Sequence, residues 1–161
     1  MVQVILVHDR HPAHVGSEGR EERPGMEESS VVRDAVLEFY EGVTTKALDR
    51  FDEIVSAETA TLVIGTAPDE WVTERPRLRF GFETEGITLE RGIRPTGYRE
   101  GTTGWFVDEP WFGFPDGGGM RTRVTAVVRE EAGRWKIVHM HFSVGVPDEE
   151  VQELQAKWGV K

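Results

Sequence analysis

The sequence contains no cysteine in its 161 residues, which excludes disulfide bonds and thiolate chemistry. Basic side chains are also scarce, because 19 lysine and arginine residues stand against 29 aspartate and glutamate residues, for a formal net charge of -10. Such a field repels phosphate backbones and anionic membrane surfaces, so neither nucleic acid nor a membrane is expected as a partner. The apolar run at residues 2–7 is too short for a signal peptide or a membrane span. No targeting segment is evident, and the cytoplasm is the expected compartment.

The length and the apolar fraction of 38%, with five tryptophans, are typical of one globular domain. Residues 8–24 contain too few apolar side chains to bury the surface that folding requires. Residues 1–28 are therefore predicted to be a flexible tail, and residues 29–161 the folded domain. The histidines at positions 8, 11 and 14 belong to this tail, where Pro12 argues against a helix. Met26 is a second candidate translation start.

The first half of the domain has helical periodicity. Ser29 or Ser30 is the expected N-cap of a helix whose apolar face runs from Val32 to Val43 and which Gly42 is expected to end. A second helix follows, capped by Thr44 or Thr45, with its apolar positions at Ala47, Leu48, Phe51, Ile54 and Val55. Residues 59–64 predict a strand, residues 65–69 a turn, and the segment after Trp71 a third helix with Pro76 near its start.

The second half has strand character instead. Strands are predicted at residues 87–94, 102–107, 121–129 and 135–144, separated by turns rich in glycine and proline. Their short connections favour antiparallel pairing, and Pro147 with the three acids after it starts a short C-terminal helix. Helices followed by a strand meander predict an α+β fold.

The last two strands form the most clearly predicted element, a hairpin with its turn at residues 130–134. One face carries only apolar side chains and should face the helices: Val124, Ala126, Val128, Val138, Met140 and Phe142. The other face carries a mixed set: Arg123, Thr125, Val127, Ile137, His139, His141 and Ser143. Across the strands, Thr125 is expected near His139 and Arg123 near His141. This mixed face requires water or a partner.

The segment from Gly133 to Ser143, together with Arg121 to Thr125 before it, resembles the SnoaL-like branch of the nuclear transport factor 2-like superfamily. It is also similar to the association domain of calcium/calmodulin-dependent protein kinase, which ends in a comparable G-[RK]-W-x-[IV]-V-H-x-H-x-S segment. The order of predicted elements agrees with this family from about Ser29 to Trp158.

The resemblance implies a cone-like, strongly curved antiparallel sheet with three N-terminal helices on its concave face and a short C-terminal helix. The cone would enclose an apolar pocket, and its convex face would form a homodimer. The superfamily includes ketosteroid isomerase, scytalone dehydratase, limonene epoxide hydrolase and polyketide cyclases, but also adaptors without enzymatic activity. The resemblance therefore leaves open whether this chain is an enzyme.

Asp108, at the end of a predicted strand, is the candidate catalytic residue. A carboxylate in the wall of an apolar cavity can act as a general base, although a solvated acid before Glu109 is the alternative. The candidate pocket residues beside it are Tyr40, Trp71, Trp105, Phe106 and Met140, which can equally be core residues. The stretch at residues 61–64, where ketosteroid isomerase has its base, carries no acid, and the acids of the epoxide hydrolase cannot be assigned.

His139 and His141 are either half of a metal site or polar residues of the convex, dimer-forming face together with Arg123 and Thr125. The second interpretation is preferred, because no cysteine or nearby aspartate completes a ligand set. Gly117 to Gly119 lacks the lysine of a phosphate-binding loop. No metal or cofactor is expected. The leading hypothesis is a pocket for a small apolar or aromatic molecule, with isomerase, dehydratase or cyclase activity open, and the alternative is a non-catalytic oligomerisation or ligand-binding module.

Overall fold

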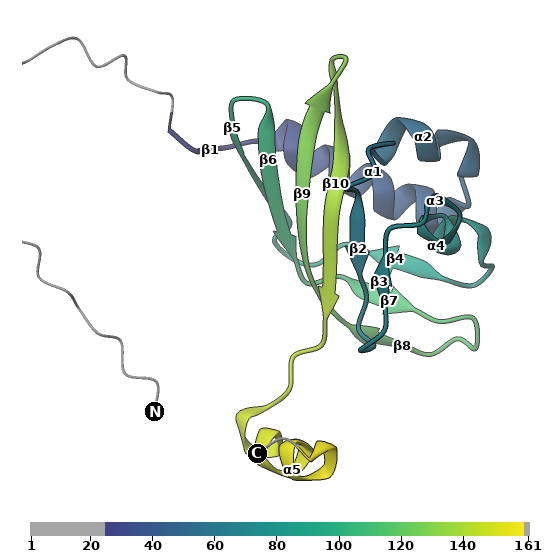
Figure 1. Ribbon diagram of the computed structural model, residues 1–161, viewed down its shortest axis with the longest axis vertical. Helices are drawn as coiled ribbons and strands as arrows, with labels where there is room; N and C mark the ends of the chain where they lie inside the picture. Colours follow the sequence, from purple (N-terminus) through teal and green to yellow (C-terminus); the bar gives the residue numbers. More distant parts are fainter. Residues whose placement is uncertain (1–24, 160–161) are drawn as a thin grey trace, which may run out of the picture.

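A computed structural model describes residues 25–159 of the chain. Its helical elements are α1 Ser30–Thr45, the 3-10 helix η1 Leu48–Arg50, α2 Phe51–Ile54, α3 Arg75–Leu78, α4 Phe80–Glu83 and α5 Asp148–Trp158. Its strands are β1 Glu27–Glu28, β2 Leu62–Ile64, β3 Trp71–Val72, β4 Thr88–Glu90, β5 Thr96–Glu100, β6 Thr103–Asp108, β7 Trp111–Gly113, β8 Gly119–Arg121, β9 Arg123–Glu131 and β10 Arg134–Ser143. The α+β class and the curved sheet expected from the sequence are confirmed (Figure 1).

Helix α1 begins where the sequence predicted, because the Ser29 hydroxyl accepts a hydrogen bond from the Val32 amide. The predicted end of the helix is wrong. Gly42 lies inside α1, which continues to Thr45 and is closed by Lys46 in the left-handed conformation. A Cβ atom on Gly42 would lie 2.5 Å from the ring of Phe82. This glycine therefore allows α4 to pack closely against α1 and does not break the helix.

The large sheet has the strand order β1-β5-β6-β9-β10-β2-β3. Its pairs are antiparallel, as expected, except that β2 joins β10 in parallel. Helix α1 crosses behind this sheet in Figure 1 and packs mainly on β5, with further contacts to β6 and β10. We call the side of the sheet that α1 covers the inner face and the opposite side the outer face.

The β9–β10 hairpin is present, but its register differs from the prediction. The turn is tight, at Ala132 and Gly133, and both residues have positive φ angles. A bulge at Val138 then reverses the alternation of side chains between the faces. Ile137 is consequently buried in the core, whereas Val138 was wrongly placed on the apolar face.

The predicted cross-strand pairs are also wrong, because the position of the turn and the bulge both change the register of the hairpin. Thr125 lies opposite His141, Arg123 lies opposite Ser143, and His139 lies opposite Val127. The inner face of the hairpin is nevertheless apolar, as expected, because Val124, Ala126, Val128, Met140 and Phe142 are buried.

Five strands escaped the sequence analysis: β1, β3, β5, β7 and β8. Strand β5 connects β1 to β6, and β7 and β8 form a small second sheet with β4 in the order β4-β7-β8. Glycines at the connected end of the β7–β8 pair, where Gly113 lies opposite Gly119, make its strand character hard to recognise in the sequence. This second sheet lies below α4 in Figure 1.

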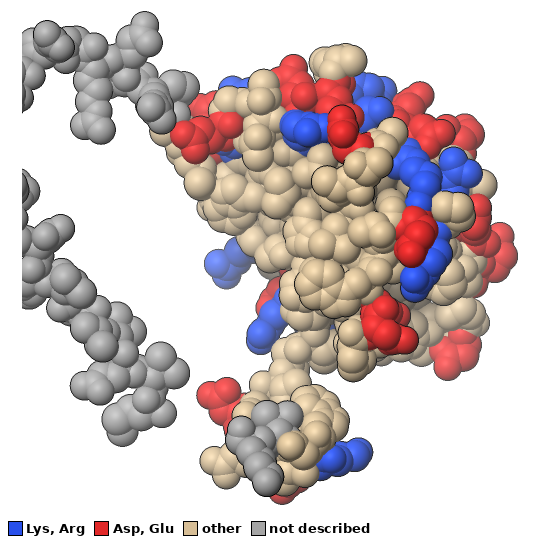
Figure 2. Space-filling model, in the orientation of Figure 1, with Lys and Arg blue, Asp and Glu red and all other residues tan. Residues whose placement is uncertain are grey.

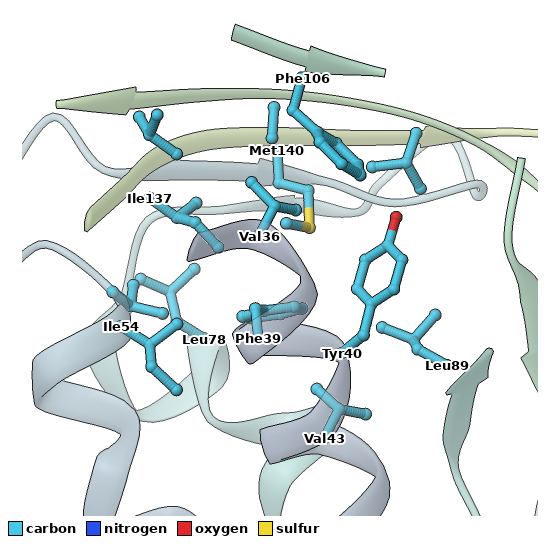
Figure 3. Packing of buried hydrophobic residues seen from close by; sticks show 14 of the residues in the cluster. Val36, Phe39, Tyr40, Val43, Ile54, Leu78, Leu89, Phe106, Ile137 and Met140 are labelled. Atoms are coloured by element: carbon cyan, nitrogen blue, oxygen red, sulfur yellow. The ribbon is translucent and has the colours of Figure 1, made fainter. Parts of the chain in front are cut away.

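The core lies between α1 and the inner face of the sheet (Figure 3). It includes the buried side of α1, the inner residues of β6, β9 and β10, and Phe51, Ile54 and Phe82 from the short helices. Phe82 contacts Phe39 and Phe51 edge-on, with ring centroids 5.3 Å apart in each pair. The aromatic rings thus join α1, α2 and α4 in one packed layer.

The two ends of the described chain differ. Glu27 and Glu28, which the sequence placed in the tail, pair with β5, while residues 1–24, including His8, His11 and His14, lie outside the described residues. Helix α5 forms as predicted but extends away from the body of the domain (Figure 1), and it has no buried residue. No helix within residues 25–159 combines the length and apolar character needed to cross a membrane.

Candidate functional site

Two polar side chains with an unpartnered atom lie in the apolar interior, Tyr40 from α1 and Asp108 from the end of β6. Tyr40 is 2% exposed and Asp108 is 7% exposed. Neither the Tyr40 hydroxyl nor the Asp108 Oδ1 atom has a hydrogen-bond partner among the described residues. Because a buried polar atom without a partner costs about 1–3 kcal/mol, this pair is the least satisfied place in the core.

The alternation of β6 explains how Asp108 reaches the interior. Phe106 and Asp108 are both buried on the inner face, opposite Ala126 and Val124 of β9. The other carboxylate oxygen, Oδ2, accepts a hydrogen bond of 2.9 Å from the Gly92 amide. Gly92 permits this close approach, because a Cβ atom there would lie 2.4 Å from Oδ1. Asp108 is therefore held by the loop that follows β4.

The electrostatics of the pair make Tyr40 a hydrogen-bond donor. Burial raises the pKa of the Tyr40 hydroxyl far above its usual value, and the nearby charge of Asp108 raises this pKa further. The hydroxyl thus keeps its proton at any physiological pH. It can donate to an oxygen or nitrogen atom placed between it and Asp108.

The surroundings of Tyr40 are apolar. Its ring contacts Phe106 edge-on at 6.1 Å, and its hydroxyl points towards Phe106 and Met140 in Figure 3, with Leu89 beside the ring. Phe106 and Met140 are completely buried. The structure thus brings together Tyr40, Phe106, Asp108 and Met140, four of the residues singled out in the sequence.

The two predicted pocket tryptophans lie elsewhere. Trp71 is 61% exposed on the edge strand β3. Trp105 points to the outer face, where it stacks on Tyr98 with ring centroids 4.4 Å apart and donates to the sulfur of Met26. Sequence reasoning missed Gly92, because its turn-forming character carries no indication that it contacts Asp108.

Two clefts are present at the surface. One, of about 560 Å³, lies between α1 and the hairpin tip and is lined by residues such as Leu37 and Trp135. The other, of about 590 Å³, lies at the end of β6 and β9 and is bordered by Asp108. Asp108 is therefore reached from the surface through the second cleft, whereas Tyr40 lines neither cleft.

The four residues predicted for the convex face lie on β9 and β10. His139 and His141 alternate with the inner residue Met140, and the His139 Nδ1 atom lies 3.1 Å from the Leu62 carbonyl oxygen of β2. Arg123 and Thr125 line the cleft of about 590 Å³. Within residues 25–159, no three histidine, aspartate or glutamate side chains gather closely enough to hold a metal ion.

Solved structures with the same fold have little sequence identity to this chain. The association domain of C. elegans CaMKII is 15% identical, with a TM-score of 0.55 over 69% of this chain and 91% of that chain. A nuclear transport factor 2-like protein from Salmonella enterica serovar Typhimurium is 15% identical, with a TM-score of 0.58 over 73% and 90% of the two chains.

A third similar structure is an NTF2-like protein with a cystatin-like fold from Novosphingobium aromaticivorans. It is 10% identical, with a TM-score of 0.58 over 77% of this chain and 86% of that chain. No curated protein sequence matches the chain. The profile of the SnoaL-like domain matches residues 32–147, which include most of α1, every strand except β1, and both Tyr40 and Asp108. The chain belongs to the SnoaL-like domain family.

Proposed function

We propose that the protein binds a small, largely apolar molecule carrying one polar group, and that Tyr40 and Asp108 hold that group. The observation that carries this proposal is the pair of buried polar atoms, from two different elements, without hydrogen-bond partners. A stable core rarely keeps such atoms unless a ligand or a water molecule satisfies them. The SnoaL-like family to which the chain belongs is a family of small-molecule-binding domains, which agrees with this role.

The hydrogen-bonding properties of Tyr40 and Asp108 determine which polar group the ligand should carry. The Tyr40 hydroxyl donates, whereas an aspartate carboxylate such as that of Asp108 accepts. A hydroxyl group on the ligand fits both, because its oxygen accepts from Tyr40 and its proton is donated to Asp108. The apolar body of the ligand would contact Phe106, Met140 and Leu89, which surround the Tyr40 ring. The ligand class is therefore an apolar or aromatic alcohol, phenol or enol.

The same geometry gives Asp108 a catalytic role if the ligand reacts. A carboxylate bonded to a ligand hydroxyl or facing an acidic C–H can remove a proton, which is the first step of an isomerisation, dehydration or cyclisation without a cofactor. Replacement of Asp108 by asparagine keeps the shape but removes the base. Turnover should fall about 10²–10⁴-fold. Unchanged turnover of the identified substrate would leave a binding role only.

Tyr40→Phe is expected to separate binding from stability. The variant removes a buried hydroxyl without a partner, so we expect the ligand-free protein to gain about 1 kcal/mol of unfolding free energy. Ligand affinity should fall at least about tenfold, because one buried hydrogen bond to the ligand is lost. Chemical denaturation measures the first effect, and native mass spectrometry of the purified protein measures retention of a co-purifying molecule.

The matched control is Tyr98→Phe, which removes a hydroxyl on the outer face, where Tyr98 stacks on Trp105. It should leave ligand retention unchanged, and it should change the free energy of unfolding by no more than about 0.5 kcal/mol. A Tyr40→Phe protein that keeps the full ligand load would remove Tyr40 from the binding site. A native protein that carries no ligand and gains no stability from apolar alcohols or phenols would overturn the proposal.

A second function, homodimer formation through the outer face, is favoured by the distribution of charge. Figure 2 shows that the middle of this face lacks charged side chains, although acidic and basic residues surround it. Half-buried Trp105, Val127, His139 and His141 lie on these central strands. One of the similar structures is a kinase association domain, an assembly module by its name. These observations support a homodimer with ligand binding on the inner face.

Light scattering on the purified chain should therefore give the mass of a dimer. Val127→Lys, which places a charge at the centre of the outer face, should give a monomer, because burying an unpaired ammonium costs several kcal/mol. An unchanged melting temperature would confirm that the variant still folds. A native chain that is monomeric at all concentrations tested would contradict the dimer without affecting the ligand proposal.

A further inference from the structure

A cleft with excess positive charge is lined by residues of β6, β8, β9 and the loop after β4. Three arginines line it, Arg94 from the loop and Arg121 and Arg123 from β8 and β9. Val107 and Thr125, which pair with each other on the outer face, form part of its wall. Asp108, which is 7% exposed, also borders the cleft, whereas Tyr40 does not line it.

The arginines of this cleft are poorly neutralised. The nearest exposed acid is Glu109, whose Oε1 atom lies 3.8 Å from the Arg123 Nε atom. Arg121 donates only a long hydrogen bond of 3.4 Å to the Glu109 backbone carbonyl. Arg94 forms no ion pair within residues 25–159. Because the whole chain carries a net charge of -10, three arginines beside exposed Glu109 and largely buried Asp108 are an exception that indicates an anionic partner.

The cleft also offers an apolar surface. Ile93 borders it and is 90% exposed, an extreme value for a large apolar side chain in a folded domain. Val107 and Val124 contribute further carbon surface. An inorganic anion would satisfy the guanidinium groups but would leave this apolar part in water. The volume of about 590 Å³ is in the range of sites for small organic molecules.

We infer that this cleft binds an organic anion whose carboxylate contacts the arginines and whose apolar body covers Ile93 and Val107. Guanidinium groups bind carboxylates through paired, charge-assisted hydrogen bonds, which supplies orientation as well as affinity. The geometry assigns the anion to Arg121 on β8, Arg123 on β9 and Arg94 in the loop after β4. This inference does not rest on the proposed function of the Tyr40–Asp108 pair.

The same loop connects the two sites. Ile93 and Arg94 directly follow Gly92, whose amide holds Asp108. An anion bound to Arg94 would therefore restrain the loop that positions the Asp108 carboxylate. Binding in the cleft is expected to shift the backbone amide signals of residues 91–95.

One competing occupant is part of the same chain. The first turn of α5 contains Asp148, Glu149 and Glu150, and only the short segment 144–147 separates it from β10. Arg123 lies against this segment, since a Cβ atom on Gly145 would meet its guanidinium group at 2.6 Å. The described structure nevertheless contains no ion pair between these acids and the cleft arginines. The test must therefore distinguish a free anion from the acidic turn of α5.

The experiment uses phenylacetate as the probe, because it combines a carboxylate with a small apolar ring. Titration of the full-length protein, followed by calorimetry and by amide NMR shifts, should show binding at residues 91–95 and 121–125. Arg123→Gln and Arg121→Gln should each weaken it about tenfold, the value of one charge-assisted hydrogen bond. Affinity should fall as the salt concentration rises.

Arg99→Gln is the matched control, because it removes an exposed arginine of the same sheet that pairs with Glu27 outside the cleft. It should leave phenylacetate affinity unchanged. Tyr40→Phe should also leave it unchanged, so this test can succeed or fail independently of the function proposed for Tyr40 and Asp108. Phenylacetamide, the neutral analogue, should bind at least about tenfold more weakly, because it lacks the charge.

Four results would overturn the inference. If phenylacetamide binds as tightly as phenylacetate, the arginines do not contribute to binding. If inorganic phosphate binds as tightly as phenylacetate, the apolar surface does not contribute. A native protein that fails to bind, beside an Asp148→Asn, Glu149→Gln, Glu150→Gln variant that binds, would identify the acidic turn of α5 as the occupant. Native affinity in both Arg121→Gln and Arg123→Gln would place the probe elsewhere.

Discussion

Replacement of Phe51 by alanine is expected to lower the free energy of unfolding by about 3–5 kcal/mol. The side chain of Phe51 is fully buried at the junction of α2, α3 and α4. Its ring contacts Phe82 edge-on at 5.3 Å, and the guanidinium groups of Arg75 and Arg79 lie 4.5 and 5.3 Å from its centroid. Alanine would lose the buried area and both cation–π contacts, and it would leave a cavity.

Urea denaturation followed by tryptophan fluorescence measures this loss, because a two-state transition gives the free energy directly. The matched control is Phe80→Ala in the neighbouring helix α4, where the phenylalanine is 62% exposed. That variant should lose no more than about 0.5 kcal/mol. Equal losses for both variants would mean that the short helices do not form the packed layer described above.

This packed layer illustrates what the sequence can predict and what it cannot. The apolar spacing identified α1, its Ser29 cap and the position of Phe51 in a second helix, because helical periodicity and capping are local properties. Gly42 was misinterpreted for a non-local reason. Its role depends on the ring of Phe82, which lies forty residues further along the chain. A glycine in a helix and a glycine that ends a helix look alike in the sequence.

The hairpin shows a second limit. Strand alternation located its apolar inner face, including Met140, and the resemblance to the SnoaL-like family was confirmed. A single bulge at Val138 nevertheless moved Ile137 to the core and shifted His139 to a position opposite Val127. One extra residue changes which face the side chains on one side of the bulge point to, relative to those on the other side. No residue type in this segment indicates that a bulge is present.

The candidate site was predictable in part. Asp108 was identified from its place at a strand end among apolar residues, and in the structure it is buried on the inner face. Two aromatic residues chosen with them, Trp71 and Trp105, point elsewhere, because their direction depends on strand position within the sheet. The arginine cleft required the structure, since it combines a loop with two strands.

Lys46→Met is expected to be the second strongly destabilising change, with a loss of about 2–4 kcal/mol. The Lys46 ammonium group donates to three backbone carbonyls: Val43 at 2.7 Å, Gly81 at 3.0 Å and Ile87 at 2.7 Å. These carbonyls belong to α1, α4 and the residue before β4, so one side chain joins three elements. Burial lowers the pKa of this ammonium group, and the charge of Glu85 opposes that effect. Methionine keeps the aliphatic stem but leaves all three carbonyls without this donor.

The backbone at Lys46 allows the side-chain effect to be measured separately. Its φ angle is 59°, in the left-handed region that favours glycine, so Lys46→Gly should be more stable than Lys46→Ala by about 1 kcal/mol. Lys136→Met is a matched control, because the Lys136 ammonium donates to only one carbonyl, that of Asp52. It should cost no more than about 1 kcal/mol. If Lys46→Met and Lys136→Met are equally stable in urea, the three hydrogen bonds of Lys46 do not hold α1, α4 and β4 together, and the rigidity of the wall beside Tyr40 must come from side-chain packing alone.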